Sequence, residues 1–155
     1  MYPEGKVVPV SLDVTDLSAI ETLGVTYPDV NLVVNNAGLF GAISSLEDIR
    51  VAQAEIAVNY IAPMAIVQSF AKNFKQQSSD KPTAIVNILS IASLINFPLG
   101  GTYSAAKAAG HSLTQAQRRD LPNSLVIGVY PGPIDTDMSS KLDFDNKETP
   151  SAVAE

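Results

Sequence analysis

A tyrosine and a lysine lie four residues apart in Thr102-Tyr103-Ser104-Ala105-Ala106-Lys107, a segment whose alanine content favours a helix. Positions i and i+4 share one face of a helix, so the Tyr103 hydroxyl and the Lys107 ammonium are expected to be neighbours. A positive charge beside a phenol favours the phenolate, and lowering the pKa of about 10 by about three units needs roughly 4 kcal/mol. The pair could therefore act as a general acid and base near neutrality. The same spacing also fits a solvated surface pair, so the other motifs of the chain must distinguish between these two interpretations.

The elements around this segment alternate between strand and helix patterns. Runs rich in Val and Ile predict strands at 7–12, 30–34, 84–89 and 125–130, and helical patterns fall at 17–23, 45–75 and 103–119. This alternation is typical of βαβ units with a parallel sheet. Ser45 is expected to cap the long helix. Pro63 is expected to end or kink it, and it cannot donate to the Asn59 carbonyl, which is left free for water or another donor.

Polar residues follow each predicted strand. Asp13, Asn35 with Asn36, and Ser90 come directly after the first three strands, and Pro131-Gly132 with Thr136 follow the fourth. In open parallel sheets, ligands bind beyond the carboxyl ends of the strands. We therefore expect a binding site at this end of the sheet.

Composition narrows the class of protein. The chain has 155 residues, 46% of them hydrophobic, and a net charge of −6, so it is expected to fold as one globular domain. It has no run of Lys and Arg, which disfavours binding to nucleic acid or to a membrane surface. The lack of cysteine excludes disulfides, a thiolate nucleophile and Cys metal sites. With no apolar secretory segment near its start, we expect a cytoplasmic protein without a metal.

Taken together, these motifs closely resemble the short-chain dehydrogenase/reductase family. The resemblance rests on Asn35-Asn36-Ala37-Gly38, Asn59, Ser90, the Tyr103 to Lys107 segment and Pro131-Gly132-Pro133-Ile134-Asp135-Thr136. Ser90 lies thirteen residues before Tyr103, and Asn59 lies twenty-four residues after Asn35, as in the family. The motifs occur in the family's order over most of the chain.

The resemblance implies a Rossmann-like, three-layer αβα domain with a mostly parallel sheet, and hydride transfer between NAD or NADP and a small carbonyl or alcohol substrate. Tyr103 would be the general acid/base, and Ser90 would hydrogen-bond the same substrate oxygen. Lys107 would lower the pKa of Tyr103 and bind the nicotinamide ribose, while Asn59 would hold a water that relays protons from Lys107. Besides Tyr103 and Lys107, the cofactor would be lined by Asp13, Val14, Asn35, Ala37, Gly38, Pro131, Gly132, Ile134 and Thr136.

Structural interpretations of the same residues remain open. Asn35 to Gly38 also suits a turn after a strand, Ser90 a cap, and Asn59 a helix kink. The only histidine, His111, is expected to be structural or on the surface. A non-catalytic fragment that binds no cofactor, or an NAD-dependent epimerase or dehydratase with the same Tyr/Lys pair, would carry the same motifs. The long helices could also form the interface of a homo-oligomer.

The chain departs from the family pattern at its start. No glycine-rich G-x-x-x-G-x-G turn precedes Asp13, and the family's first two strands are not found. In the order 3-2-1-4-5-6, those strands lie between the third and the fourth. We therefore expect residues 1–155 to be a partial cofactor-binding domain, incomplete at both ends, in which strand 7–12 lacks its neighbour and strand 30–34 exposes an apolar edge. On its own, this fragment is expected to be inactive.

Overall fold

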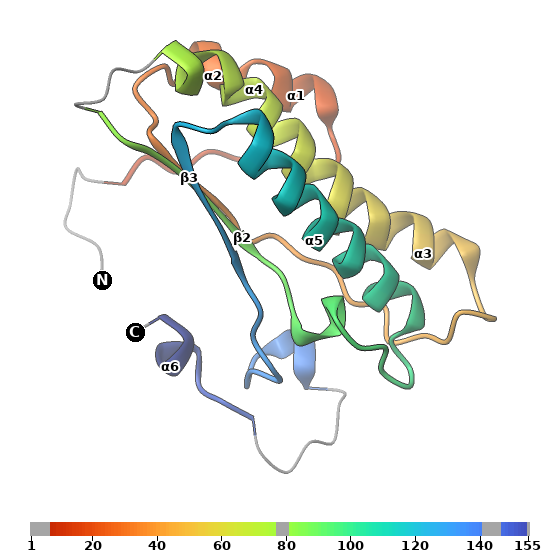
Figure 1. Ribbon diagram of the computed structural model, residues 1–155. Coiled ribbons are helices and arrows are strands. Elements are labelled where there is room, and N and C mark those ends of the chain that lie inside the picture. Colours follow the sequence, from red (N-terminus) through yellow and green to blue (C-terminus); the bar gives the residue numbers. More distant parts are fainter. Residues whose placement is uncertain (1–6, 77–80, 141–146, 155) are drawn as a thin grey trace.

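A parallel sheet of three strands forms the centre of the computed structural model, which describes residues 7–76, 81–140 and 147–154. The strands are β1 (Leu32–Asn35), β2 (Thr83–Ile88) and β3 (Ser124–Val129), in the order β1-β2-β3. Leu32 pairs with Ala84, which pairs with Leu125. The predicted Rossmann-like α/β architecture with a parallel sheet is confirmed (Figure 1).

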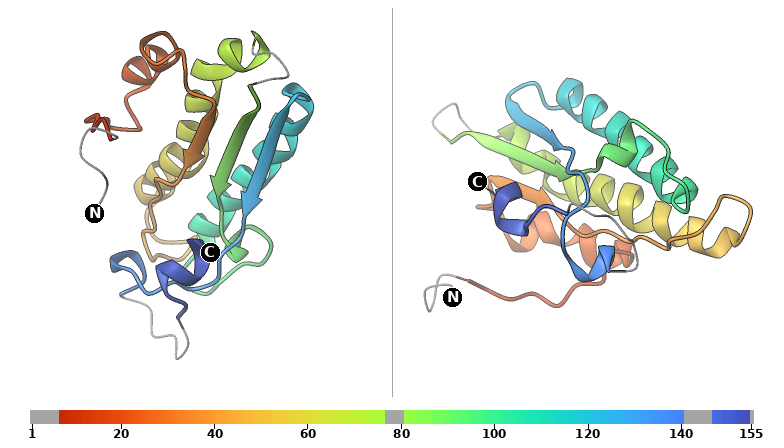
Figure 2. Two further views of the ribbon diagram at one scale, coloured as in Figure 1. Left: turned by 90° about the vertical axis from the view of Figure 1, so that its left-hand side faces the viewer. Right: turned by 90° about the horizontal axis from the view of Figure 1, so that it is seen from below.

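The long helices cover one face of this sheet. Helices α4 (Ala62–Gln76) and α5 (Gly101–Asp120) run side by side along that face, and α3 (Ile49–Ile56) extends beyond the sheet against α5 (Figures 1 and 2). Alternate strand residues point into the interface, where they join apolar side chains of the helices. The resulting core contains Val33, Val67, Phe70, Phe74, Ile85, Leu121 and Val126.

Two short helices pack on the outer side of α4. They are α1 (Leu17–Glu21), whose cap Asp16 accepts from the amides of Ser18 and Ala19, and α2 (Leu23–Thr26). Gly24 allows α2 to approach closely, because a Cβ at this position would collide with the Ser69 carbonyl. Asn73 secures the contact by donating to the Gly24 carbonyl at 2.7 Å.

The predicted helix 45–75 starts later in the structure, and the interruption expected at Pro63 takes the form of a π-helical turn just before it. Asp48, not Ser45, caps it, because the Asp48 carboxylate accepts from the Arg50 amide at 2.8 Å and also pairs with the Arg50 guanidinium. Pro63 does not end it. Instead, the π-helical turn Ala57–Ile61 separates α3 from α4, and the Ala62 amide bonds to Ala57, five residues back. A π turn is one way for a helix to absorb the misfit at a proline.

The prediction of a strand at 7–12 is wrong. Residues 7–12 run outside the sheet, with Val8 75% exposed, because a strand needs a neighbour for its hydrogen bonds. The sheet face opposite the helices is also open in the described part of the chain. Leu32 and Val34 of β1 and Leu125 and Ile127 of β3 are exposed there. The apolar exposure predicted around 30–34 therefore extends across the sheet.

The end of the described chain returns to the loop that follows β3. Glu148 bridges to Ile134, and its amide donates to the Pro133 carbonyl at 3.0 Å. A short helix, α6 (Pro150–Ala154), follows. None of the helices in the described ranges is long and apolar enough to cross a membrane.

Candidate active site

Ser90 and Tyr103 are brought together by the connection between β2 and α5. Ser90 follows the end of β2 and caps the 3-10 helix Ile91–Ser93, where its hydroxyl accepts from the Ala92 amide at 3.1 Å. The chain then turns into α5, which begins at Gly101 and places Tyr103 in its first turn. The Ser90 hydroxyl interacts with the Tyr103 phenol. Ser90 therefore forms the cap considered as its structural alternative and also lies beside Tyr103, with which it was predicted to share the substrate oxygen.

Lys107 lies one turn further along α5, beneath the Tyr103 ring. Its ammonium donates to the Ile88 carbonyl at 2.9 Å and lies 5.6 Å from the centroid of the ring. The side chain is buried. Burial disfavours the charged form and lowers the pKa of Lys107 from 10.5 to about 8.

The pKa of Tyr103 moves in the direction opposite to the one predicted. Burial raises it, interaction with Ser90 lowers it, and the negative charge of Glu55 raises it further. The prediction considered only the charge of Lys107, whereas the enclosed site disfavours the phenolate as well as the ammonium. In this structure, the phenol therefore keeps its proton at neutral pH.

Asn59 binds the loop that leaves β1. It lies in the π-helical turn, and its side chain accepts from the Leu39 amide at 3.1 Å and donates to the Leu39 carbonyl at 2.7 Å. Asn35, at the end of β1, instead points into the core, where it donates to Asn87 at 2.7 Å. The Oδ1 atom of Asn35 is buried without a partner in the described part of the chain.

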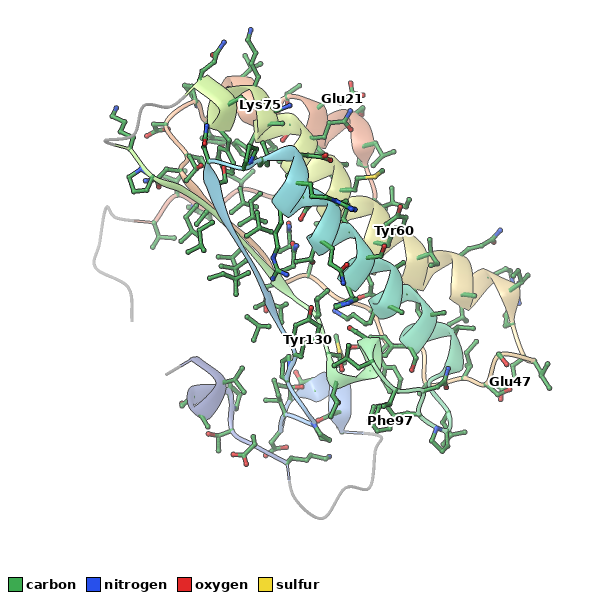
Figure 3. All side chains as sticks on the ribbon, in the orientation of Figure 1. Glu21, Glu47, Tyr60, Lys75, Phe97 and Tyr130 are labelled. Carbon is green, nitrogen blue, oxygen red and sulfur yellow. The ribbon has the colours of Figure 1, made fainter. Side chains whose placement is uncertain are left out.

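Two hollows lie beside these residues, at the carboxyl ends of the strands. A cleft of about 440 Å³ is lined by Ser90, Tyr103, Lys107 and the predicted cofactor residues Gly38, Pro131, Ile134 and Thr136. A cavity of about 10 Å³ is lined by Asn35, Ala37, Asn59 and Lys107. Figure 3 shows Tyr130 and Phe97 toward this end of the molecule, and Lys75 and Glu21 at the other.

Five of the predicted cofactor residues do not line the cleft, and two of them, Asn35 and Ala37, line the smaller cavity instead. Asp13 and Val14 lie apart from the cleft, and Asp13 is exposed and bonded to the amide and hydroxyl of Thr15, at 2.8 and 2.7 Å. Those two bonds lower the pKa of Asp13. Gly132 faces open space, with nothing within 4 Å of the position of a Cβ. The described residues thus bring Ser90, Tyr103 and Lys107 together, place Asn59 at the adjoining cavity, and assemble only part of the predicted cofactor site.

Glu55 and Phe40 are two residues of the site that the sequence reasoning missed. Glu55 is fully buried; its Oε1 accepts from the Gly41 amide at 2.8 Å, and its Oε2 has no partner in the described ranges. A Cβ at Gly41 would collide with Val51, so glycine permits this close approach. Phe40, next to Gly41, meets the Tyr103 ring edge to face at 5.0 Å. For Glu55, the sequence did offer a signal, because this carboxylate lies one helical turn before Asn59 and on the same face of the predicted helix.

Comparisons with known proteins agree with this geometry. The family described as short chain dehydrogenase matches residues 2–147. An uncharacterized oxidoreductase of Staphylococcus saprophyticus is 30% identical over 148 residues, which are 92% of this chain and 61% of that protein. An NADP-dependent 3-hydroxy acid dehydrogenase of Schizosaccharomyces pombe is 28% identical over 88% of this chain and 54% of its own length.

Solved structures show the same relationship. A short chain dehydrogenase from Burkholderia cenocepacia in complex with NADP has a TM-score of 0.88 and 33% identity, over 97% of this chain and 66% of that one. An NADPH-bound carbonyl reductase from chicken fatty liver has a TM-score of 0.79 and 27% identity, over 95% of this chain and 66% of the reductase. The chain thus spans about two thirds of these structures and less of the two relatives above. With a family match over nearly its whole length, the chain belongs to the short-chain dehydrogenase family.

Proposed function

We propose that this chain carries the catalytic part of an NAD(P)-dependent oxidoreductase, which transfers a hydride between the cofactor and a carbonyl or alcohol, with Tyr103 as general acid/base. The observation that supports this most directly is the meeting of Ser90, Tyr103 and Lys107 in one cleft. Similarity to structures that contain NADP or NADPH supports the choice of cofactor. A bound dinucleotide would supply or accept the hydride.

The described residues fit the nicotinamide half of such a cofactor. Gly38, Pro131, Ile134 and Thr136 line the cleft next to Lys107, and the backbone at Gly132 is open to a ligand. Lys107 uses one N–H on Ile88, so two remain for ribose hydroxyls or water. Residues for the adenine and pyrophosphate are not assembled in the described part of the chain, because Asp13 lies away from the cleft.

Tyr103 and Ser90 would act on the substrate oxygen. As the carbonyl carbon accepts the hydride, Tyr103 would give its proton to the oxygen, and Ser90 would donate a hydrogen bond to it. The raised pKa of Tyr103 keeps the phenol protonated, which is the form that carbonyl reduction requires. In the reverse direction, the phenolate would accept the alcohol proton.

Lys107 and Asn59 would return the proton to Tyr103. With a pKa of about 8, Lys107 can exchange protons close to neutral pH. It shares the cavity of about 10 Å³ with Asn35 and Asn59. Such a volume is at the lower limit for one water, and the buried Oδ1 of Asn35 is a free acceptor for it. We assign this water to the proton relay.

Tyr103→Phe tests the proposal in a chimera that joins a relative's N-terminal segment, including its glycine-rich turn, to Val7. NADPH oxidation at 340 nm should fall by about 10²- to 10⁴-fold, while NADPH binding, followed by fluorescence, should stay nearly unchanged. Tyr130→Phe is the matched control, because Tyr130 bonds His111 at 2.7 Å and does not line the cleft. Near wild-type kcat in Tyr103→Phe would exclude Tyr103 as the acid/base.

A further inference from the structure

One wall of the cleft is apolar and partly aromatic. Its side chains are Phe40, Ile91, Ala92, Phe97, Pro98 and Met138. Phe40 packs against the Tyr103 ring, and Gly100 lies between Phe40 and Phe97, since a Cβ there would be 3.5 Å from Phe40 and 3.7 Å from Phe97. The two aromatic side chains therefore flank the space in front of the Tyr103 phenol.

The charges around the cleft are few and badly placed for an anionic substrate. Among the described residues that line it, only Lys107 and Asp137 carry charge. Lys107 lies at the floor, bonded to Ile88, and the relay described above engages it. Asp137 is exposed at the rim and would repel a carboxylate. A carboxylate that enters an apolar pocket without a cation opposite it loses hydration without compensation.

We propose that the cleft accepts an uncharged aryl or branched-alkyl ketone or aldehyde, or the matching alcohol, and discriminates against analogues that carry a carboxylate. This deepens the proposed function and rests on it, because Tyr103 and Ser90 are taken to hold the carbonyl oxygen. The apolar part of the substrate would lie in the cleft against Phe40 and Phe97. The proposal separates this chain from its relative named for 3-hydroxy acids.

Binding can be measured on the chain itself, because every residue invoked belongs to it. Propiophenone and benzoylformate both present an aryl ketone, but one carries an ethyl group where the other carries a carboxylate. Labelling methionine methyl groups with ¹³C gives a reporter inside the cleft, Met138, and a control outside it, Met64 on α4. Met138→Leu assigns the reporter signal, and circular dichroism verifies folding.

Propiophenone should shift the Met138 signal saturably without moving Met64, and benzoylformate should bind at least about tenfold more weakly. Asp137→Asn should reduce the difference in affinity between the two ligands about threefold, because it removes a screened repulsion of the carboxylate. Phe97→Ala should weaken the binding of propiophenone. Equal or tighter binding of benzoylformate, or no shift of Met138 with propiophenone, overturns the proposal. If the isolated chain does not fold, the same titration in the chimera decides by the same criteria.

The titration needs neither cofactor nor turnover, so its result can contradict the proposed ligand class without contradicting the proposed function. Selective binding of propiophenone without any hydride transfer in the chimera would refute the oxidoreductase and retain the ligand class. Turnover that favours benzoylformate over propiophenone would support the oxidoreductase and refute the proposed ligand class.

Discussion

The Lys107 ammonium donates a hydrogen bond to the Ile88 carbonyl at 2.9 Å, which ties helix α5 to the last residue of β2. The bond holds the ammonium below the Tyr103 ring, in a buried position. The pKa of Lys107 is about 8 in the folded protein, against 10.5 for a free side chain. The buried position of this cation therefore has a cost in stability.

Lys107→Met should make the protein more stable at pH 7, provided that the apolar side chain fits the same space. Between pH 8 and 10.5 the unfolded chain binds more protons than the folded one, so wild-type stability rises with pH, by about 1.4 kcal/mol per unit. The full shift corresponds to about 3 kcal/mol. Urea unfolding from pH 7.5 to 9.5, below the titration of the phenols, should show this slope in the wild type but not in Lys107→Met.

Lys72→Met, at an exposed position of α4, is the matched control and should keep the wild-type slope. If the curves of wild type and Lys107→Met run parallel over this pH range, burial does not lower the pKa of Lys107 as described.

Asn59→Leu should release the loop after β1, because both bonds to the Leu39 backbone are lost and a half-buried amide and carbonyl are left unpaired. We expect the free energy of unfolding to fall by about 2 kcal/mol, the low end for two unsatisfied groups at about 1–3 kcal/mol each, because Leu39 is only half-buried. Exchange of the Leu39 amide hydrogen, followed by NMR, should accelerate sharply.

Asn59→Asp separates the two bonds, since it keeps the acceptor for the Leu39 amide and loses the donor to the carbonyl. Protection of that amide should then fall between wild type and Asn59→Leu. Asn73→Ala, which removes a single bond to Gly24 far along α4, should leave Leu39 unaffected. Unchanged exchange at Leu39 in Asn59→Leu would show that the contact does not hold the loop in solution.

Glu55→Gln should lower the pKa of Tyr103 and keep the loop in place. The amide oxygen can still accept from Gly41, while the negative charge that raises the pKa of Tyr103 is removed. Tyrosine labelled with ¹³C at Cζ reports this pKa, with Tyr103→Phe for assignment. Glu55→Ala removes the acceptor of the Gly41 amide, so the neighbouring Phe40 should leave the Tyr103 ring. The NMR signals of both rings should then broaden. An unchanged or higher Tyr103 pKa in Glu55→Gln would contradict the electrostatic contribution.

The sequence was sufficient to predict the parts of the site that follow from local geometry. Tyr103 and Lys107 share a face because their helix is regular, and Ser90 reaches them because it ends the strand before that helix. The same rules predicted a parallel sheet with its polar residues at one end. Each of these features depends on spacing along the chain, which the sequence states directly.

The features that were missed depend on contacts between distant segments. The Glu55 bond to Gly41 needs a loop to fold back over α3, and the raised pKa of Tyr103 depends on how closely the cleft is enclosed. Strand 7–12 was predicted from its own side chains, but a strand also needs a partner. Local pattern carries none of this information.

Residues 1–155 alone should therefore not catalyse hydride transfer. In the described ranges, the outer edge of β1 has no neighbouring strand, the opposite face of the sheet leaves Leu125 61% exposed, and Asp13 lies away from the cleft. A cofactor held by its nicotinamide half only would bind weakly. NADPH fluorescence should show no saturable binding to the chain below about 1 mM, an affinity worth only about 4 kcal/mol. The chimera with a relative's N-terminal segment should bind NADPH at least about a hundredfold more tightly, a difference of about 3 kcal/mol. Tight binding and carbonyl reduction by the isolated chain would show that the catalytic cleft alone is sufficient.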